Sequence, residues 1–147
     1  MASSLPDVAE DLLLLASVKP ALASLVIVSG SRNAYSGPER PSKGSGIPLE
    51  STFWEVAGGR ADLHNDGRLR VVEVQCLVRG KRQDYDASRL KATAILDNLD
   101  LNGPFTGASS GRQYIDVVAV NATPIPLGPG ESDAEYFAIN FNVTLEG

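Results

Sequence analysis

The residues of this sequence that could bind a metal ion lie in one short stretch, Asp62-Leu63-His64-Asn65-Asp66. Two carboxylates and an imidazole offer the oxygen and nitrogen ligands that divalent metals take in proteins. On an extended strand, however, alternate side chains reach one ion only when further ligands come from elsewhere in the fold. The overlapping Asn65-Asp66-Gly67 is a strong turn signal. We interpret the stretch as a polar turn and expect neither a metal nor a cofactor.

The segment from residue 37 to residue 46, GPERPSKGSG, invites comparison with a phosphate-binding loop. Such a loop has the order G-x-x-x-x-G-K-[ST] and opens a helix after a strand. Here Lys43 precedes its glycine, Gly44, and no helical pattern follows. The sequence therefore does not predict a nucleotide site in this segment.

Nucleophilic catalysis requires a base within hydrogen-bonding reach of the nucleophile. The only histidine, His64, lies in the polar turn, and the only cysteine, Cys76, lies in the middle of an apolar run. Glu73 and Asp116 could meet on one face of a sheet, but a polar cross-strand pair accounts for both without catalysis. We predict that the chain is not an enzyme.

The basic cluster Arg79-Gly80-Lys81-Arg82 lies between a strand-like and a helix-like segment. It could contact phosphates, but Asp84 and Asp86 follow at once, so local pairing of these charges is the simpler interpretation. The whole chain has a net charge of −5 and an isoelectric point of about 4.8. Because nucleic-acid affinity depends on neutralising phosphates, this balance argues against a dedicated nucleic-acid binder.

A length of 147 residues, with 43% hydrophobic and 21% charged residues, suits one domain with a modest core. We expect a single domain over residues 1–147. A single cysteine makes no internal disulfide, which is typical of a reducing cytoplasm. The first residues do not read as a secretory signal, and no apolar run approaches the length of a membrane span.

The first half of the chain predicts one helix, a short strand and a long loop. Pro6 and Asp7 suit a helix start, and Val8, Leu12, Leu15 and Ala16 form one apolar face after it. Residues 22–28 fit either a second helical piece or a first strand, and the run Val26-Ile27-Val28 favours the strand. Residues 29–48 are rich in Gly, Ser and Pro, so we expect a long flexible loop there that becomes ordered against a partner.

The second half alternates strands with one helix. We expect a strand over residues 51–57 that ends at Gly58-Gly59, and a strand over 71–78 with Val72, Val74, Cys76 and Val78 on one face. A helix follows, with Asp84 as N-cap and a buried stripe formed by the apolar residues Ala87, Leu90, Ala94, Ile95 and Leu99.

Residues 114–120 predict a further strand, and residues 123–130 are too rich in proline for a central strand. Residues 136–145 alternate strictly between apolar and polar side chains, which predicts a half-buried strand antiparallel to a neighbour. The fold class is therefore α+β: an antiparallel or mixed β-sheet with helices packed on one face and long loops at the ends.

The stretch VEVQCLVRGKRQDYDASRLKATAILDNL resembles the signature of tail terminator proteins of long-tailed bacteriophages, also described as minor capsid or tail completion proteins. The matching residues are Val74, Leu77, Val78, Arg79, Gly80, Tyr85, Ala87, Ile95 and Leu99. Three further stretches are similar in order and spacing: Trp54-Glu55-Val56 with Gly58-Gly59, residues 124–128, and the closing YFAINFNVTLE. The resemblance covers roughly residues 45–146.

The resemblance implies an α+β subunit of a hexameric ring that caps the tail tube, ends its polymerisation and joins the head-side connector. It implies a virion protein of the tail or neck, made in the host cytoplasm, with DNA passing through the lumen without specific binding. We expect contacts to the tail tube protein and to the head-closure or connector protein. The candidate interface residues are Arg32, Tyr35, Arg40, Lys43, Arg79, Lys81, Arg82, Glu131, Asp133, Tyr136, Asn140 and Asn142.

Two mechanisms of contact between subunits are open at this point. Long loops suit docking onto another ring, and the strand over residues 136–144 could extend a sheet from one subunit to the next. Two other functions also remain open. The first is another neck component, such as a head-closure or adaptor protein, and the second is a small ligand-binding or enzymatic α+β domain.

Overall fold

The computed structural model describes residues 7–36, 50–61, 69–82, 84–129 and 134–146. Three helical segments lie in these ranges: α1 (Asp7–Val18), the short 3-10 helix η2 (Pro20–Leu22) and α2 (Tyr85–Leu99). The strands are β1 (Ala34–Ser36), β2 (Ser51–Ala61), β3 (Leu69–Arg82), β4 (Phe105–Thr106), β5 (Gln113–Ala119), β6 (Ile125–Pro129) and β7 (Ala134–Glu146).

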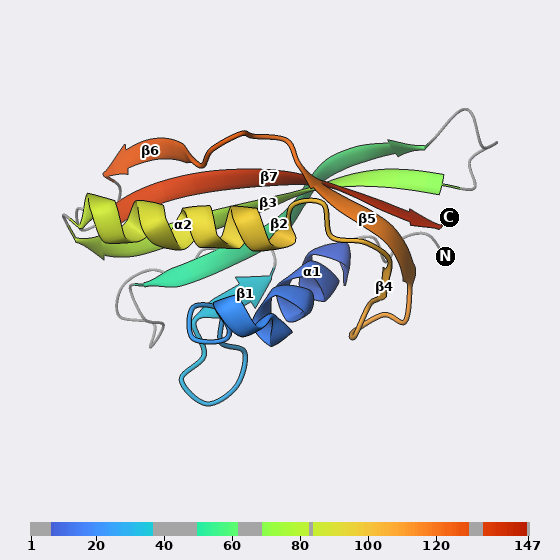
Figure 1. Ribbon diagram of the computed structural model, residues 1–147, viewed down its shortest axis with the longest axis horizontal. Coiled ribbons are helices and arrows are strands. Elements are labelled where there is room, and N and C mark those ends of the chain that lie inside the picture. The colour runs from blue at the N-terminus through green and yellow to red at the C-terminus, as the bar shows by residue number, and fades with distance from the viewer. Residues whose placement is uncertain (1–6, 37–49, 62–68, 83, 130–133, 147) are drawn as a thin grey trace.

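These strands form one curled sheet in the order β1-β2-β3-β7-β5-β4, and β6 pairs with β7 beside β5. The β1–β2 pair is parallel and the other pairs are antiparallel. Both long helices lie against one face, with α2 along β3 and β7 and α1 enclosed by the curl of the sheet (Figure 1). The predicted α+β class, with a mixed sheet and helices on one face, is confirmed.

The two longest strands follow the predicted alternation. Val72, Val74, Cys76 and Val78 of β3 are buried beneath the helices, as are Phe137, Ile139, Phe141, Val143 and Leu145 of β7. However, β7 pairs with β3 along one side and with β5 and β6 along the other. The suggestion that this strand extends the sheet into a neighbouring subunit is therefore wrong, because both of its edges are already paired.

The predicted stripe of α2 is only partly correct. Ile95 and Leu99 are buried, but Ala87 is exposed and the Leu90 side chain is 60% exposed. The buried face instead consists of Ser88, Ala92, Ile95, Leu96 and Leu99. The small Ser88 and Ala92 allow the helix to approach the sheet closely, and this approach fixes its rotation. The Asp84 N-cap is confirmed, since its Oδ1 accepts a hydrogen bond from the Ala87 N–H at 3.3 Å.

The predicted strand over Val26-Ile27-Val28 is wrong, because Val26 lies in a bend and Ile27 and Val28 have no regular secondary structure; Asn33 holds this segment. The Asn33 Oδ1 accepts from the Ile27 N–H at 2.8 Å, and its Nδ2 donates to the Leu25 carbonyl at 3.1 Å. Val26 is nevertheless buried, so its apolar character reflects core packing rather than strand pairing. The first strand, β1, lies instead inside the range that we expected to be loop; residues 37–48 of that loop lie outside the described residues.

Two further boundaries differ from the sequence prediction. Gly58-Gly59 does not end β2; the strand continues to Ala61 with a bulge between Val56 and Gly58, where Gly58 adopts a φ of 133°. The proline-rich segment does form a strand, β6, but this strand lies at the border of the sheet and pairs with β7 alone. Within the described part of the chain, no helix has the length and apolar character needed to cross a membrane.

Candidate interaction surface

The sheet face opposite the helices carries a transverse row of apolar side chains, here called the apolar row. Successive strand registers place Tyr35 beside Phe53, Phe53 beside Leu77, Leu77 beside Ala138, and Ala138 beside Ile125. The three central members are buried and the two outer members, Tyr35 and Ile125, are partly exposed. The row thus crosses five strands of the helix-free face, in the order β1, β2, β3, β7 and β6.

Polar rows flank the apolar row on the same face. On one side, Glu55 lies beside Gln75, and Gln75 lies beside Asn140. The next rows place Glu73 beside Asn142, and Thr144 beside Asp116. β7 separates Glu73 from Asp116, so the two carboxylates share a face without being neighbours. This part of the helix-free face is therefore acidic and rich in amides.

Two arginines enclose the aromatic end of the apolar row. The Arg32 guanidinium carbon lies 5.1 Å from the centre of the Tyr35 ring, and Tyr35 stacks on Phe53 with ring centres 6.0 Å apart. The Arg79 guanidinium carbon lies 4.9 Å from the centre of the Phe53 ring. Each cation faces the negative surface of a π-system, an arrangement that stabilises both ring orientations. Arg32 is exposed, whereas Arg79 is only 4% exposed.

The structure brings six of the predicted interface residues together on the helix-free face. Tyr35 belongs to the apolar row, Asn140 and Asn142 lie in the polar rows, and Tyr136 lies beside Arg79. Arg32 completes the group through its contact with Tyr35. Because Arg79 is buried against Phe53, we assign it a supporting position in this surface rather than a direct contact.

The remaining predicted residues lie elsewhere or cannot be placed. Lys81 is exposed near the end of β3, and the backbone of Arg82 pairs with Ala134. Arg40, Lys43, Glu131 and Asp133 lie outside the described residues. Sequence reasoning missed Phe53, the residue that connects Tyr35 to Arg79. Its position opposite Leu77 depends on the β2–β3 register, which no local pattern reveals.

The junction between β3 and α2 is explained by packing. A Cβ atom added to Gly80 would lie 2.6 Å from the Ser88 Cβ and closer still to its Oγ. The Ser88 hydroxyl donates to the Asp84 carbonyl at 2.7 Å, so Ser88 is held in place by the first turn of the helix. Gly80 is therefore needed where the backbone of β3 lies directly against α2, two residues before the strand ends at Arg82.

A second buried contact fixes the loop between β4 and β5. Asp11 of α1 accepts hydrogen bonds from the backbone N–H groups of Ser109 and Ser110, at 2.8 and 3.1 Å, and from the Ser110 hydroxyl. The Tyr114 hydroxyl also donates to Asp11 Oδ2, at 2.5 Å. The Asp11 side chain, 1% exposed, thus holds the loop onto the first helix. The sequence offered no signal for this contact.

The thiol of Cys76 is not suited to nucleophilic catalysis. Cys76 is fully buried beneath the helices, and this burial raises the pKa of its thiol far above the ordinary value, although the Lys91 charge lowers it somewhat. A catalytic cysteine needs the opposite shift, since the thiolate is the nucleophile. We expect Cys76 to resist a thiol-specific reagent in the native protein and to react fully after unfolding in urea. Rapid labelling under native conditions would contradict its buried position.

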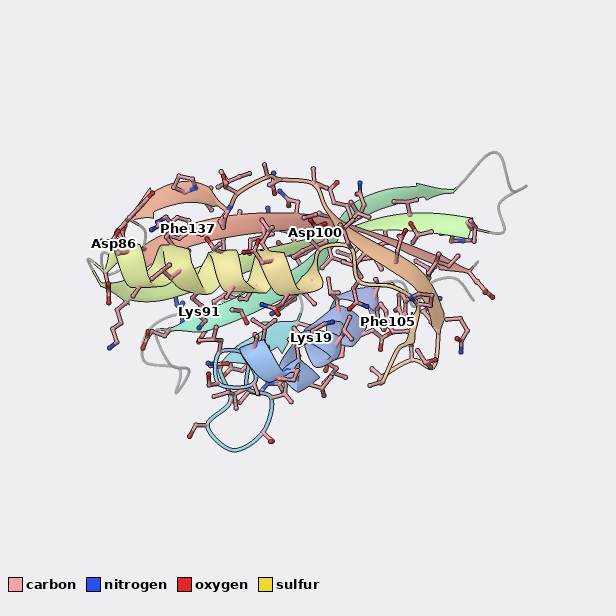
Figure 2. All side chains as sticks on the ribbon, in the orientation of Figure 1. Lys19, Asp86, Lys91, Asp100, Phe105 and Phe137 are labelled. Carbon is pink, nitrogen blue, oxygen red and sulfur yellow. The ribbon has the colours of Figure 1, made fainter. Side chains whose placement is uncertain are left out.

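Lys91 lies on the side of α2 that faces β1 and β2 (Figure 2). Burial lowers the pKa of Lys91 below its ordinary value of 10.5, and the negative charge of Glu50 partly offsets this effect. The folded chain therefore binds the Lys91 proton less tightly than the unfolded chain does. The charged amine costs stability below its folded pKa, and this cost is released as the pH rises toward 10.5.

We accordingly expect Lys91→Met to raise the free energy of unfolding at neutral pH. The gain should shrink as the pH approaches 10, because the wild-type amine then loses its proton. Urea denaturation at a series of pH values measures both effects. Arg89→Met, at an exposed position of the same helix, is the matched control and should show no such pH-dependent gain. A stability difference for Lys91→Met that is constant over pH would contradict the assignment.

No group of three His, Cys, Asp or Glu residues within the described ranges is arranged to hold a metal ion. The stretch Asp62 to Asp66, which carries the candidate ligands, lies outside those ranges. Most of the predicted interface residues that the structure describes lie together on the helix-free face.

Comparison with solved structures finds a similar fold in a chain of a structure described as "Virion of native gene transfer agent (GTA) particle". The TM-score is 0.61 at 16% sequence identity, and the alignment covers 98% of this chain and 99% of that chain. At this identity the likeness shows a shared fold over the whole length of both chains. No protein-family model matches the sequence, and no curated protein sequence matches it.

Proposed function

We propose that this chain is a structural virion protein of the tail-terminator kind. In this proposal, copies of the chain form a hexameric ring that caps the tail tube, ends its polymerisation and offers a joining surface to the head-side connector. The proposal includes no catalysed reaction and no cofactor. The observation that carries it is the full-length fold likeness to a chain of the gene transfer agent virion.

Two features of the chain support the finer role. The stretch that resembles the tail terminator signature includes Arg79 and Gly80, and Gly80 lies where the backbone of β3 contacts α2. Such a junction gives a rigid frame, which suits a subunit that acts by shape. The helix-free face is acidic around Glu55, Glu73 and Asp116, and the whole chain carries a net charge of −5. A ring with this charge would repel phosphates and let DNA pass without adhering.

The contacts to partners are proposed for the helix-free face and for loops. Arg32, Tyr35, Tyr136, Asn140 and Asn142 are the described candidates on that face, with Lys81 at the end of β3. The predicted residues Arg40, Lys43, Arg82, Glu131 and Asp133 complete the proposed interface. In a heterologous interface, one surface of a subunit contacts a different surface of the next subunit. Such contacts close into a ring when the rotation between successive subunits allows it.

Immunogold labelling of intact particles locates the protein directly. Antibodies raised against the purified chain should label one position per particle, where the tail meets the head. Labelling along the whole tail would indicate a tube protein, and labelling over the head surface would indicate a capsid protein. Absence of the chain from purified particles, with the protein only in the soluble lysate, would overturn the proposal and favour a ligand-binding or enzymatic domain.

A further inference from the structure

The free edges of the described sheet are each closed to the addition of another strand, and we infer that a second copy of this chain cannot extend the sheet. Exposed strand edges present unpaired N–H and C=O groups that invite pairing with another chain. Here each such edge is short, bulged, lacking donors or covered by other groups of the chain. The inference goes beyond the proposed function because it excludes one mode of contact between copies of the chain, namely pairing between their edge strands.

The β1 edge is closed by the side chain of Arg32. The Thr52 N–H donates to the Asn33 carbonyl at 2.8 Å, so in this parallel pair the carbonyl of Asn33 and the N–H of Tyr35 face β2. The backbone of Ala34 consequently faces away from the sheet. Its carbonyl accepts a hydrogen bond from the Arg32 Nε at 2.7 Å. Arg32 thus occupies the outward carbonyl of Ala34 in a strand of only three residues.

The β6 edge is closed by two prolines. The Val120 N–H donates to the Asn140 carbonyl at 2.8 Å, so the even-numbered residues of β7 direct their backbone groups toward β5 and β6. Ala138 therefore forms a backbone hydrogen-bonded pair with Ile125, and Tyr136 forms one with Gly128. Pro126 and Pro129 lie at the intervening register positions, where the backbone nitrogen faces outward. Since proline has no N–H, this edge lacks the donors that strand pairing requires.

The β5 edge is closed by the connection that follows α2. Val118 pairs with Asn142 of β7, so the N–H groups of Val117 and Ala119 face away from β7. The Val117 N–H donates to the Asn102 carbonyl at 3.0 Å, and the Ala119 N–H donates to the Asp100 Oδ1 at 2.8 Å. Both outward donors of this part of β5 are therefore already satisfied.

The two remaining edges are irregular. β4 contains only two residues, Phe105 and Thr106. β1 covers β2 only from Thr52 to Trp54, and the uncovered part contains the bulge at Ala57, which interrupts a regular row of donors and acceptors. Five different local features therefore hinder the addition of a strand at the edges of the described sheet. A second copy must instead contact the chain through side chains of its faces and loops.

Opening the two best-defined edges tests the inference. The variant Arg32→Ser/Pro126→Thr/Pro129→Thr frees the Ala34 carbonyl and restores N–H donors to β6. Arg89→Ser/Pro104→Thr, which removes one exposed arginine and one exposed proline elsewhere, is the matched control. Sedimentation velocity over a concentration series measures the mass of each protein, and thioflavin T binding reports intermolecular sheet. We expect the edge-opened variant to form larger, thioflavin-positive species whose mass rises with concentration, while the control sediments as the wild type does.

An edge-opened variant with native circular dichroism that sediments like the control would overturn the inference. If the triple variant does not fold, Arg32→Ser alone and Pro126→Thr/Pro129→Thr alone open one edge each and are read in the same way. The comparison between the edge-opened variant and the control can be interpreted whether or not the wild-type chain forms rings. If the wild type forms closed rings, the opened variant must grow beyond them, and if the wild type stays a single chain, the opened variant must still associate.

Discussion

Replacing Gly80 with alanine is expected to destabilise the protein strongly. The added Cβ would lie 2.6 Å from the Ser88 Cβ and closer to its Oγ, and Ser88 is held by its hydrogen bond to the Asp84 carbonyl. The helix must therefore move away from β3, where Cys76 and Val78 pack beneath it. Overpacking of this kind costs about 3 kcal/mol. Urea denaturation followed by circular dichroism measures the loss.

Two further variants isolate the cause. Gly103→Ala is the control, since a Cβ at Gly103 meets no atom within 4 Å, and it should change stability by no more than about 0.5 kcal/mol. The double variant Gly80→Ala/Ser88→Gly removes the opposing side chain and leaves the Ser88 Cα 3.5 Å away. It should recover part of the loss, limited by the cost of about 1 kcal/mol for glycine in a helix. Equal stability of Gly80→Ala and Gly103→Ala would contradict the packing account.

Replacing Asp11 with alanine is the second change with a large expected effect. The side chain is buried and accepts hydrogen bonds from Ser109, Ser110 and Tyr114. Its removal leaves these donors without their acceptor, which costs about 3 kcal/mol or more for a buried group with several partners. We also expect the backbone N–H groups of Ser109 and Ser110 to exchange with solvent much faster, because the loop is released from α1.

The close approach of the loop makes the effect specific to this position. A Cβ on Gly107 would lie 2.5 Å from the Asp11 Cγ, so the loop backbone lies directly against the carboxyl group. Asp97→Ala, at an exposed position of α2, is the matched control and should leave both stability and loop exchange unchanged. Unaltered exchange at Ser109 and Ser110 in Asp11→Ala would show that the loop is held by other contacts.

The long strands could be predicted from sequence because their signal is local. β3 and β7 are buried on one face, so their apolar residues recur at every second position, and the structure has that pattern. The rotation of α2 could not be predicted, because it depends on the approach of Ser88 to Gly80 across two elements. Leu90, which the sequence predicted to be buried near the start of the helix, is exposed for this reason.

Features that depend on contacts between residues far apart in the sequence also could not be predicted, because no local pattern indicates such contacts. β1 lies in a Gly/Ser-rich stretch with no apolar alternation and exists because Tyr35 pairs beside Phe53. Asp11 meets Ser109, which is 98 residues away along the chain. Of the predicted interface residues, Tyr35, Tyr136, Asn140 and Asn142 share the helix-free face, whereas Phe53, which contacts both Tyr35 and Arg79, was not among the predictions.

The central claim, that this protein ends the growth of a tail tube, is tested most directly by tail length. The measurement is negative-stain imaging of particles made from a genome in which this gene is deleted, beside the same genome complemented with the wild-type chain. The proposal predicts tails of abnormal length that are not attached to filled heads, and complementation restores uniform attached tails. Normal-length free tails beside leaking heads would assign the chain to the head side of the neck. Intact infectious particles without the gene would contradict a structural role in the virion.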